Sequence, residues 1–282
     1  MADLTDQYLE KMEDVLEVYE RPCNPAEPVV CLDEKPVSLH ADVRPARPMA
    51  PGKLKRPDNE YKRCGTANVF CAVEPKAGKH FTLATPNRSA PQLAQALETI
   101  IASYPAAHTI HMVMDNLNIH GPKTLTDYFG KDKGRQLWNR LTVHYTPKHG
   151  SWLNQAEIEI SLFARQCLAR RRIPTLAMLQ RESVAWNSKV NQQRIKINWQ
   201  FTRKKARVKF SYKRSKKNRF MRSKTWFANC AMRGEVAPAT SCVTTGTSTC
   251  EVGGDTFGWP KHERPYASWK VGSADTFESA SG

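Results

Sequence analysis

Two short apolar runs in this chain each end in an aspartate, and this pattern constrains the fold more than any other feature. The first run covers residues 29–32 and is followed by Asp33, and the second covers residues 110–114 and is followed by Asp115. Apolar runs of this length predict buried strands. A third acid, Glu157, stands at the start of a predicted helix. Two acids at strand ends and a third on a later helix can meet over the edge of a sheet.

The order of the predicted elements favours an α/β fold. Several strands follow one another early in the chain, and helices then alternate with strands, which is typical of a mixed β-sheet flanked by α-helices. The predicted strands cover 28–33, 37–42, 67–73, 79–84, 108–114 and 141–146, and the predicted helices cover 4–20, 91–103, 121–139, 154–171 and a segment after Pro174.

Composition divides the chain into three parts. Residues 1–27 are expected to form an N-terminal helix and a linker, and residues 28–210 one folded domain that carries the three acids. Residues 211–224 are a basic run, and residues 233–282 are rich in Gly, Ser and Thr. Segments of that kind bury too little apolar surface to fold, so 211–282 is predicted to be an irregular, disordered tail.

The charge of the chain points to a nucleic acid as partner. The formal net charge is +16 and the isoelectric point is about 9.6. The charge is unevenly distributed: residues 1–34 hold ten Asp or Glu against two Lys or Arg, whereas residues 165–224 hold twenty Lys or Arg against one acid. A cationic segment of that density predicts salt-dependent binding to phosphates, with DNA or RNA as the first candidates.

Cysteine spacing and hydropathy exclude several other classes of protein. The eight cysteines form no Cys-x-x-Cys pair, which argues against a zinc site or a disulfide framework and favours a reducing compartment. No apolar run approaches the ~20 residues needed to cross a bilayer, and the acidic N-terminus has no signal-peptide core. We therefore expect a soluble cytoplasmic protein without a membrane partner.

Carboxylates in this arrangement predict metal-dependent phosphoryl transfer. Mg²⁺ and Mn²⁺ prefer oxygen ligands, and two such ions can activate an attacking oxygen and stabilise a leaving one. The residues alone leave the third acid open between Glu157 and Glu159, which lie about 200° apart on a helix. Glu34 and Asp42 are weaker candidates, next to or beyond the first strand end.

Five separated blocks occur in order along the chain and carry a family resemblance. They are Val30-Cys31-Leu32-Asp33-Glu34-Lys35-Pro36, Tyr61-Lys62-Arg63-Cys64-Gly65-Thr66-Ala67-Asn68, Met114-Asp115-Asn116-Leu117-Asn118-Ile119-His120, His144-Tyr145-Thr146-Pro147-Lys148-His149-Gly150-Ser151-Trp152-Leu153-Asn154-Gln155-Ala156-Glu157 and Asn198-Trp199-Gln200-Phe201-Thr202. Over about residues 10–209 the chain resembles the catalytic domain of bacterial insertion-sequence transposases of the mariner superfamily, which are DDE-type enzymes with a ribonuclease H-like fold.

This resemblance implies an activity and a set of site residues. Asp33, Asp115 and Glu157 would be the catalytic and metal-binding acids, with two Mg²⁺ or Mn²⁺ ions between them. The implied reaction is hydrolysis at transposon ends followed by strand transfer into target DNA, by a homodimer assembled on DNA in the bacterial nucleoid. The expected DNA contacts are Asn116, His120, Lys148, His149, Trp152, Asn154, Arg165, Arg170, Arg171 and Arg172, and for Trp152 a packing role is at least as well founded.

The resemblance also leaves a gap at the N-terminus. Family members recognise their terminal inverted repeats with a helix-turn-helix region, whereas one acidic helix precedes residue 28 here. The recognition part is then expected on a separately encoded chain, or the chain is a truncated copy. Two other readings stay open: a structure-specific nuclease of the same fold, and a catalytically inactive DNA-binding remnant of a truncated transposase.

Overall fold

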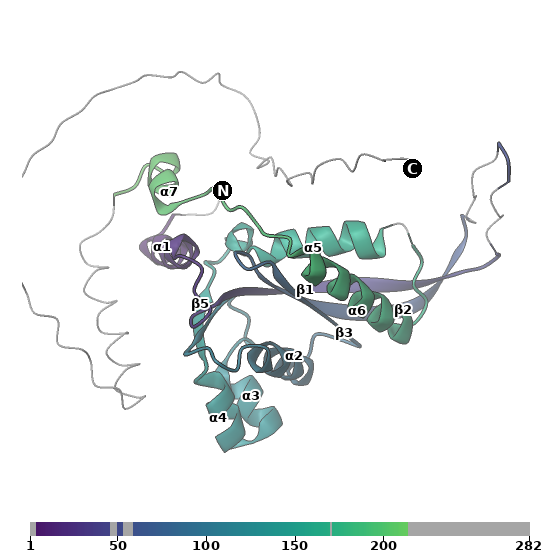
Figure 1. The fold of residues 1–282 in the computed structure, drawn as a ribbon, viewed down its shortest axis with the longest axis horizontal. Helices are drawn as coiled ribbons and strands as arrows, with labels where there is room; N and C mark the ends of the chain where they lie inside the picture. The colour runs from purple at the N-terminus through teal and green to yellow at the C-terminus, as the bar shows by residue number, and fades with distance from the viewer. Residues whose placement is uncertain (1–3, 46–49, 53–58, 170, 214–282) are drawn as a thin grey trace, which may run out of the picture. The chain divides into compact units, whose positions relative to one another are not determined.

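A mixed five-stranded sheet forms the centre of the computed structural model, which describes residues 4–45, 50–52, 59–169 and 171–213 (Figure 1). The strand order is β3-β2-β1-β4-β5. The first three strands pair antiparallel, and β4 and β5 run parallel to β1. The strands are β1 (Val29–Asp42), β2 (Tyr61–Glu74), β3 (Lys79–Thr85), β4 (Ile110–Met114) and β5 (Leu141–Tyr145).

The helices follow the predicted alternation with the later strands. They are α1 (Asp6–Glu20), α2 (Ala90–Ala102), α3 (Pro122–Phe129), α4 (Lys131–Trp138), the short 3₁₀ helix η1 (Ser151–Leu153), α5 (Ala156–Phe163), the π-helical turn η2 (Ala164–Leu168), α6 (Leu176–Gln193) and α7 (Arg203–Lys209). The predicted fold class, a mixed sheet flanked by helices, is confirmed. None of the helices described here has the length and apolar character needed to cross a membrane.

One face of the sheet is covered by α2 and α3. Alternate residues of β1 and β4, Val30 and Leu32 together with Met112 and Met114, pack in one apolar cluster with these helices. The predicted apolar stripe of α2 is buried, since Leu93, Leu97, Ile100 and Ile101 are all at most 4% exposed. The alternate residues of the strands and the helically spaced residues of α2 therefore pack against one another in this layer.

The opposite face carries two clusters side by side. Over β1, β2 and β3, the helices α5 and α6 contribute Phe163, Leu179 and Trp186 to an apolar cluster. Over β1 and β4, α1 packs against Cys31 and Val113 in a second cluster. Both α5 and α6 thus cover the face opposite to the one that α2 covers. The two halves of this face meet near the start of α5.

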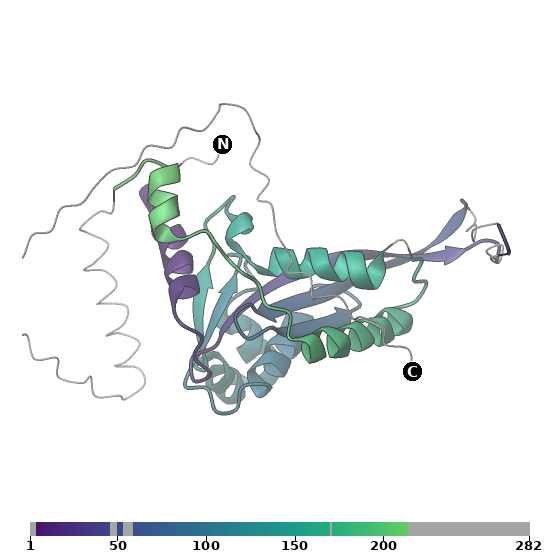
Figure 2. The same cartoon turned by 45° about the horizontal axis from the view of Figure 1, so that its top comes forward.

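Two predicted strands, 28–33 and 37–42, are one continuous strand, β1. Pro36 suggests a break because it cannot donate to a ladder. Beyond Cys31, however, β1 pairs only with β2, so its other edge has no strand partner to which Pro36 would have to donate. β1 and β2 run on past the helices as a two-stranded ribbon (Figures 1 and 2).

Two predicted helices are interrupted. The segment 121–139 divides into α3 and α4 at Gly130, whose φ of 85° is a backbone conformation that glycine adopts easily. The segment 154–171 begins two residues late and passes into the π-helical turn η2. Neither change affects the layer in which the helix lies.

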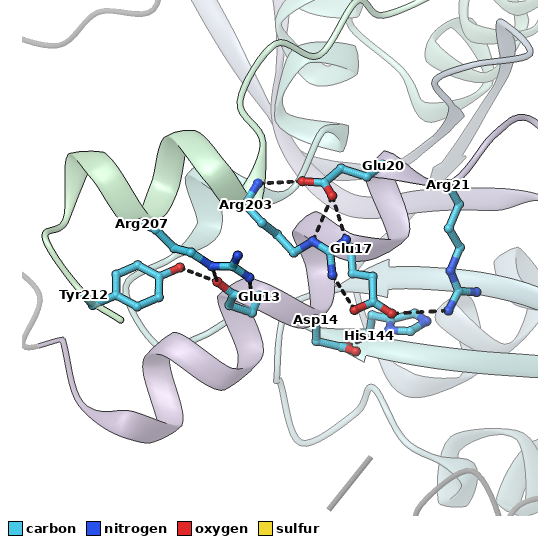
Figure 3. A network of polar contacts seen from close by, with 9 residues as sticks. All are labelled: Glu13, Asp14, Glu17, Glu20, Arg21, His144, Arg203, Arg207 and Tyr212. Carbon is cyan, nitrogen blue, oxygen red and sulfur yellow. Dashed lines mark hydrogen bonds and ion pairs between the residues drawn. The ribbon is translucent and has the colours of Figure 1, made fainter. Parts of the chain in front are cut away.

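The predicted boundary at residue 27 is not a structural one. α1 shares its apolar cluster with the sheet, and α7, which the sequence did not predict, lies against α1. Three glutamates of α1 hold two arginines of α7: Arg203 binds Glu17 and Glu20, and Arg207 binds Glu13 (Figure 3). Both ends of the described chain thus belong to the unit that contains the sheet. The predicted tail lies, from residue 214 on, outside the described residues.

The contact between α1 and α7 is expected to weaken in acid. Burial opposes ionisation of Glu13, but hydrogen bonds from Arg207 and Tyr212 outweigh burial and lower the pKa of this carboxyl below 4.5. A group whose pKa is lowered on folding stabilises the fold above its unfolded pKa, and this stabilisation is lost as the pH falls through the folded pKa. Glu13→Gln should therefore lower the unfolding free energy at neutral pH, and its difference from wild type should shrink below pH ~4.5 in denaturant titrations. A difference that does not change with pH would contradict this linkage.

Candidate catalytic carboxylate site

Asp33 lies inside β1 rather than at its end. It pairs with Cys71 of β2, two residues beyond Cys31, the last residue that β1 pairs with β4. The prediction of a strand end is therefore wrong for β1, although the pairing with β4 does end just before Asp33. Asp33 therefore lies just past the point where β4 stops pairing with β1 and where, among the described strands, β1 is paired with β2 alone.

The two aspartates share one face of the sheet. Asp115 directly follows β4 and continues the alternation of His111 and Val113, while Asp33 continues that of Cys31. Cys31 and Val113 belong to the cluster under α1, and Ala156, the first residue of α5, belongs to the same cluster. The exposed Glu157 follows Ala156 in the first turn of α5. All three predicted acids therefore project on the side of the sheet that carries α1 and α5.

The charges of these acids act on one another. Burial raises the pKa of Asp33 to about 7, and the negative charges of Glu157, Glu34 and Asp115 add to this rise against a hydrogen bond from the Glu34 amide. Like charges of this kind disfavour the ionised form of the Asp33 carboxyl. Within residues 4–45, 50–52, 59–169 and 171–213, no three His, Cys, Asp or Glu side chains form a ready-made metal-binding group. The acids share a face and an electric field without forming a closed cage.

The side chain of His120 contacts Asp115 and Glu34. Its ring is 1% exposed and lies between two carboxylates, with Nδ1 2.6 Å from Asp115 Oδ1 and Nε2 2.9 Å from Glu34 Oε1. Burial alone would lower the pKa of His120, but the hydrogen bonds to Asp115 and Glu34 outweigh it and raise the pKa to about 10. With 1% exposure and with both ring nitrogens within 2.9 Å of carboxylates, this side chain has no surface to offer to DNA. The predicted role of His120 in DNA binding does not fit this position.

Asn154 is likewise buried and contacts β1. Its Nδ2 donates to the Leu32 carbonyl at 2.9 Å and to Asp33 Oδ2 at 3.4 Å, and its Oδ1 accepts from the Ala156 amide at 3.1 Å. At 1% exposure, Asn154 has no surface to offer to DNA. The sequence prediction placed it in a DNA-facing loop, whereas it joins that loop to β1.

The other predicted DNA contacts of this region are exposed. Asn116, Lys148 and His149 all lie on the surface, and His149 has a φ of 63° in the turn before η1. Trp152 is 41% exposed, but its ring packs edge-on against Phe201 at 5.4 Å, and its Nε1 donates to the Tyr8 hydroxyl at 3.3 Å. Trp152 is therefore a packing residue on one side, with its other side open.

The four predicted arginines differ in their contacts. Arg165 is exposed and its Nε donates to the Ser161 carbonyl. Arg171 pairs with Glu182 at 2.9 Å, and Arg172 pairs with Asp42 at 2.6 Å. Arg170 lies outside the described residues. Two of the four thus already have a carboxylate partner within the chain.

The structure separates Glu157 from Glu159. Glu159 is 1% exposed and lies 2.8 Å from His80 Nδ1, whose Nε2 contacts the Ile195 carbonyl at 2.9 Å. Glu157 is exposed, and its charge raises the pKa of Asp33. The helix therefore turns Glu159 into the core beside His80 of β3 and leaves Glu157 exposed.

A comparison with protein families gives one match that covers more than half of the chain. Residues 28–180 match the model of the DDE superfamily endonuclease. The chain belongs to the DDE superfamily endonuclease family. The matched part of this DDE domain spans all five strands, and it contains Asp33, Asp115 and Glu157.

Solved structures give more distant neighbours. The chain is similar to the Mos1 mariner paired-end complex with Mn, at 14% identity and a TM-score of 0.43, covering 68% of this chain and 60% of that chain. It is also similar to the Mos1 strand transfer complex, at 14% identity and a TM-score of 0.41, covering 68% and 61%. The chain thus spans about 60% of the length of these structures. A search of curated proteins found no match.

Sequence reasoning missed two residues that support the acids. Glu34 was considered only as a possible ligand, and it instead holds His120. Tyr19 of α1 was assigned to an apolar stripe, yet its hydroxyl reaches the turn before α5. Both contacts join residues far apart in the chain, and no local pattern encodes them.

Removal of the Glu159 side chain should reduce the stability of the fold, whereas removal of the Glu157 side chain should not. Glu159→Ala leaves His80 without its buried partner and should lower the unfolding free energy by about 3 kcal/mol. Glu157→Ala alters an exposed side chain and should leave stability nearly unchanged. Denaturant titrations of the two variants test the assignment. A large loss of stability in Glu157→Ala, or none in Glu159→Ala, would reverse it.

Proposed function

We propose that the DDE domain cleaves phosphodiester bonds at DNA ends and transfers the strands, as a transposase of the mariner type. The main support is the placement of Asp33, Asp115 and Glu157 on one face of the sheet, where two of the acids raise the pKa of the third. Such mutual repulsion is what a bound cation relieves. Two of the similar structures, a paired-end complex and a strand transfer complex, agree with this chemistry.

Asp33, Asp115 and Glu157 would hold the metal. Their donor atoms are all carboxylate oxygens, the type that Mg²⁺ and Mn²⁺ prefer, and two neighbours are described with Mn and with Mg. When bound, a pair of such ions would activate the attacking oxygen and stabilise the leaving one. The two-ion arrangement is part of this proposal.

The rest of the site would keep the acids in place. The Glu34 amide donates to Asp33 Oδ1 at 2.8 Å, and the Asn154 amide approaches its other oxygen at 3.4 Å. The His120 ring holds Oδ1 of Asp115 at 2.6 Å, which leaves the other oxygen of that carboxylate for a ligand. Fixed positions matter because phosphoryl transfer depends mainly on orientation and on stabilisation of charge.

DNA is the proposed partner, with a homodimer formed on paired ends. Lys148, His149 and Trp152 precede η1 or lie in it, next to the turn that leads to Glu157, and all three are exposed. They are better placed for DNA contact than Arg171 and Arg172, which bind acids of the chain. A separately encoded helix-turn-helix part would recognise the DNA ends. Since the three acids are intact, nothing in the site favours the inactive remnant.

Asp115→Asn should abolish Mg²⁺- or Mn²⁺-dependent cleavage of DNA and leave DNA affinity almost unchanged. The substitution keeps the shape of the side chain and removes the charge that would bind the metal. Asp33→Asn should behave in the same way. Asp127→Asn is the matched control, because Asp127 is exposed on α3, on the other face of the sheet. The measurement is nicking of labelled duplex, and cleavage retained by Asp115→Asn would refute the site.

Lys148→Gln should weaken DNA binding at every sequence and make it less dependent on salt. Removal of one phosphate contact should reduce the slope of log K against log salt concentration by about one. Lys123→Gln, at an exposed position on α3, should leave the slope unchanged. Fluorescence anisotropy at several salt concentrations gives both slopes. Equal slopes for Lys148→Gln and wild type would remove Lys148 from the DNA-binding surface.

A further inference from the structure

We infer that the hydroxyl of Tyr19 is a positioning group for Glu157, supplied by a helix that lies outside the part of the chain matched by the family. The inference rests on the proposed function, because it concerns the same carboxylate site. Its basis is the way in which α1 and β1 hold the turn between η1 and α5.

The Tyr19 hydroxyl joins three segments of the chain. It donates to the Leu153 carbonyl at 2.8 Å and accepts from the Gln155 amide at 3.4 Å. It also lies 3.3 Å from Cys31 Sγ of β1. The residue is 6% exposed, so water cannot readily replace these contacts. One oxygen atom therefore links α1, β1 and the turn that precedes Glu157.

Asn154 ties the same turn to β1 a second time. Its side chain donates to the Leu32 carbonyl and approaches Asp33 Oδ2, while its Oδ1 accepts from the Ala156 amide. Residues 153–156 are thus attached to residues 31–33 through two side chains. Asp33 ends one of these segments and Glu157 directly follows the other. The two attachments consequently set the position of one acid relative to the other.

The position of Tyr19 is itself well determined. Its ring packs edge-on against Trp199 at 5.6 Å. Farther along α1, Asp14 lies 2.6 Å from His144 of β5, and His144 lies 2.9 Å from His111 of β4. The glutamates of α1 hold α7 on its outer side (Figure 3). Because these contacts hold α1 in place, the Tyr19 hydroxyl can fix the position of the turn.

α1 and α7 both lie outside residues 28–180, the part that matches the family. The matched part contains the three acids and Asn154 but lacks Tyr19. The helix that the sequence assigned to a linker region therefore completes the site. Since small displacements of reacting groups can reduce rates by as much as ~100-fold, loss of one attachment should be measurable.

Tyr19→Phe tests the inference, because it removes the hydroxyl and keeps the ring. In metal-free protein, amide exchange of Gln155 should become at least ~10-fold faster, since its acceptor is lost. Mn²⁺ affinity, measured by calorimetry, should fall by about tenfold, and cleavage at low Mn²⁺ should fall by a similar factor and recover as Mn²⁺ is raised. The melting temperature should stay within ~4 °C of wild type.

Tyr8→Phe is the matched control. Tyr8 is a second buried tyrosine of α1, but its hydroxyl accepts from the Trp152 side chain rather than binding the backbone of the turn. It should leave Gln155 exchange and Mn²⁺ affinity unchanged. If Tyr19→Phe exchanges and binds Mn²⁺ like wild type, the inference is overturned.

The same experiment separates failure of the inference from failure of the proposed function. Wild-type protein that neither binds Mn²⁺ nor cleaves DNA would refute the proposed function. The exchange of Gln155 in Tyr19→Phe would then decide by itself whether the hydroxyl fixes the turn, and unchanged exchange would overturn that claim too. Asp33→Asn, which removes a proposed ligand and keeps Tyr19, should lose Mn²⁺ binding without faster exchange at Gln155.

Discussion

The attachment of the η1–α5 turn to β1 is the constraint on which the carboxylate site depends. Asp33 lies on β1 and Asp115 directly follows the adjacent parallel strand β4, so the sheet sets the separation of their backbones. Glu157 belongs to a helix, whose placement over the sheet is not set by any ladder. Two side chains fix that placement: Tyr19 of α1 donates to the Leu153 carbonyl of the turn, and Asn154 of the turn donates to the Leu32 carbonyl of β1. Without them, the third acid would be positioned by apolar packing, which is less directional, and by the Glu159–His80 contact farther along α5.

A second theme is the pairing of buried charge around the site. His120 lies between Glu34 and Asp115, and His80 lies against Glu159. Buried carboxylates without partners are costly, and the two rings supply polar partners for the buried Glu34 and Glu159. Asp33 and Glu157 have no such cationic partner among the ion pairs of the described residues. The negative charge left over is concentrated where a metal would be needed.

Sequence patterns were sufficient for the class of fold and for the placement of Asp115 directly after a buried strand, because burial and alternation are local properties. They failed where the local structure depends on the end of a neighbouring strand or on a contact with a residue far away in the sequence. The continuity of β1 through Pro36 depends on where β4 stops, and this is a property of the sheet. Glu157 and Glu159 flank the same apolar face, so only the position of His80 distinguishes them. Tyr19 and Leu153 are 134 positions apart, and their contact cannot be read from spacing.

The packing of α1 also bears on how this domain can be divided. A fragment limited to residues 28–180 would lack α1 and α7 and would end inside α6. The apolar side chains that α1 covers, among them Cys31, Val73 and Val113, would then face solvent. Exposed apolar surface of that kind favours aggregation. The segment that can fold by itself is therefore longer than residues 28–180, the segment that matches the family.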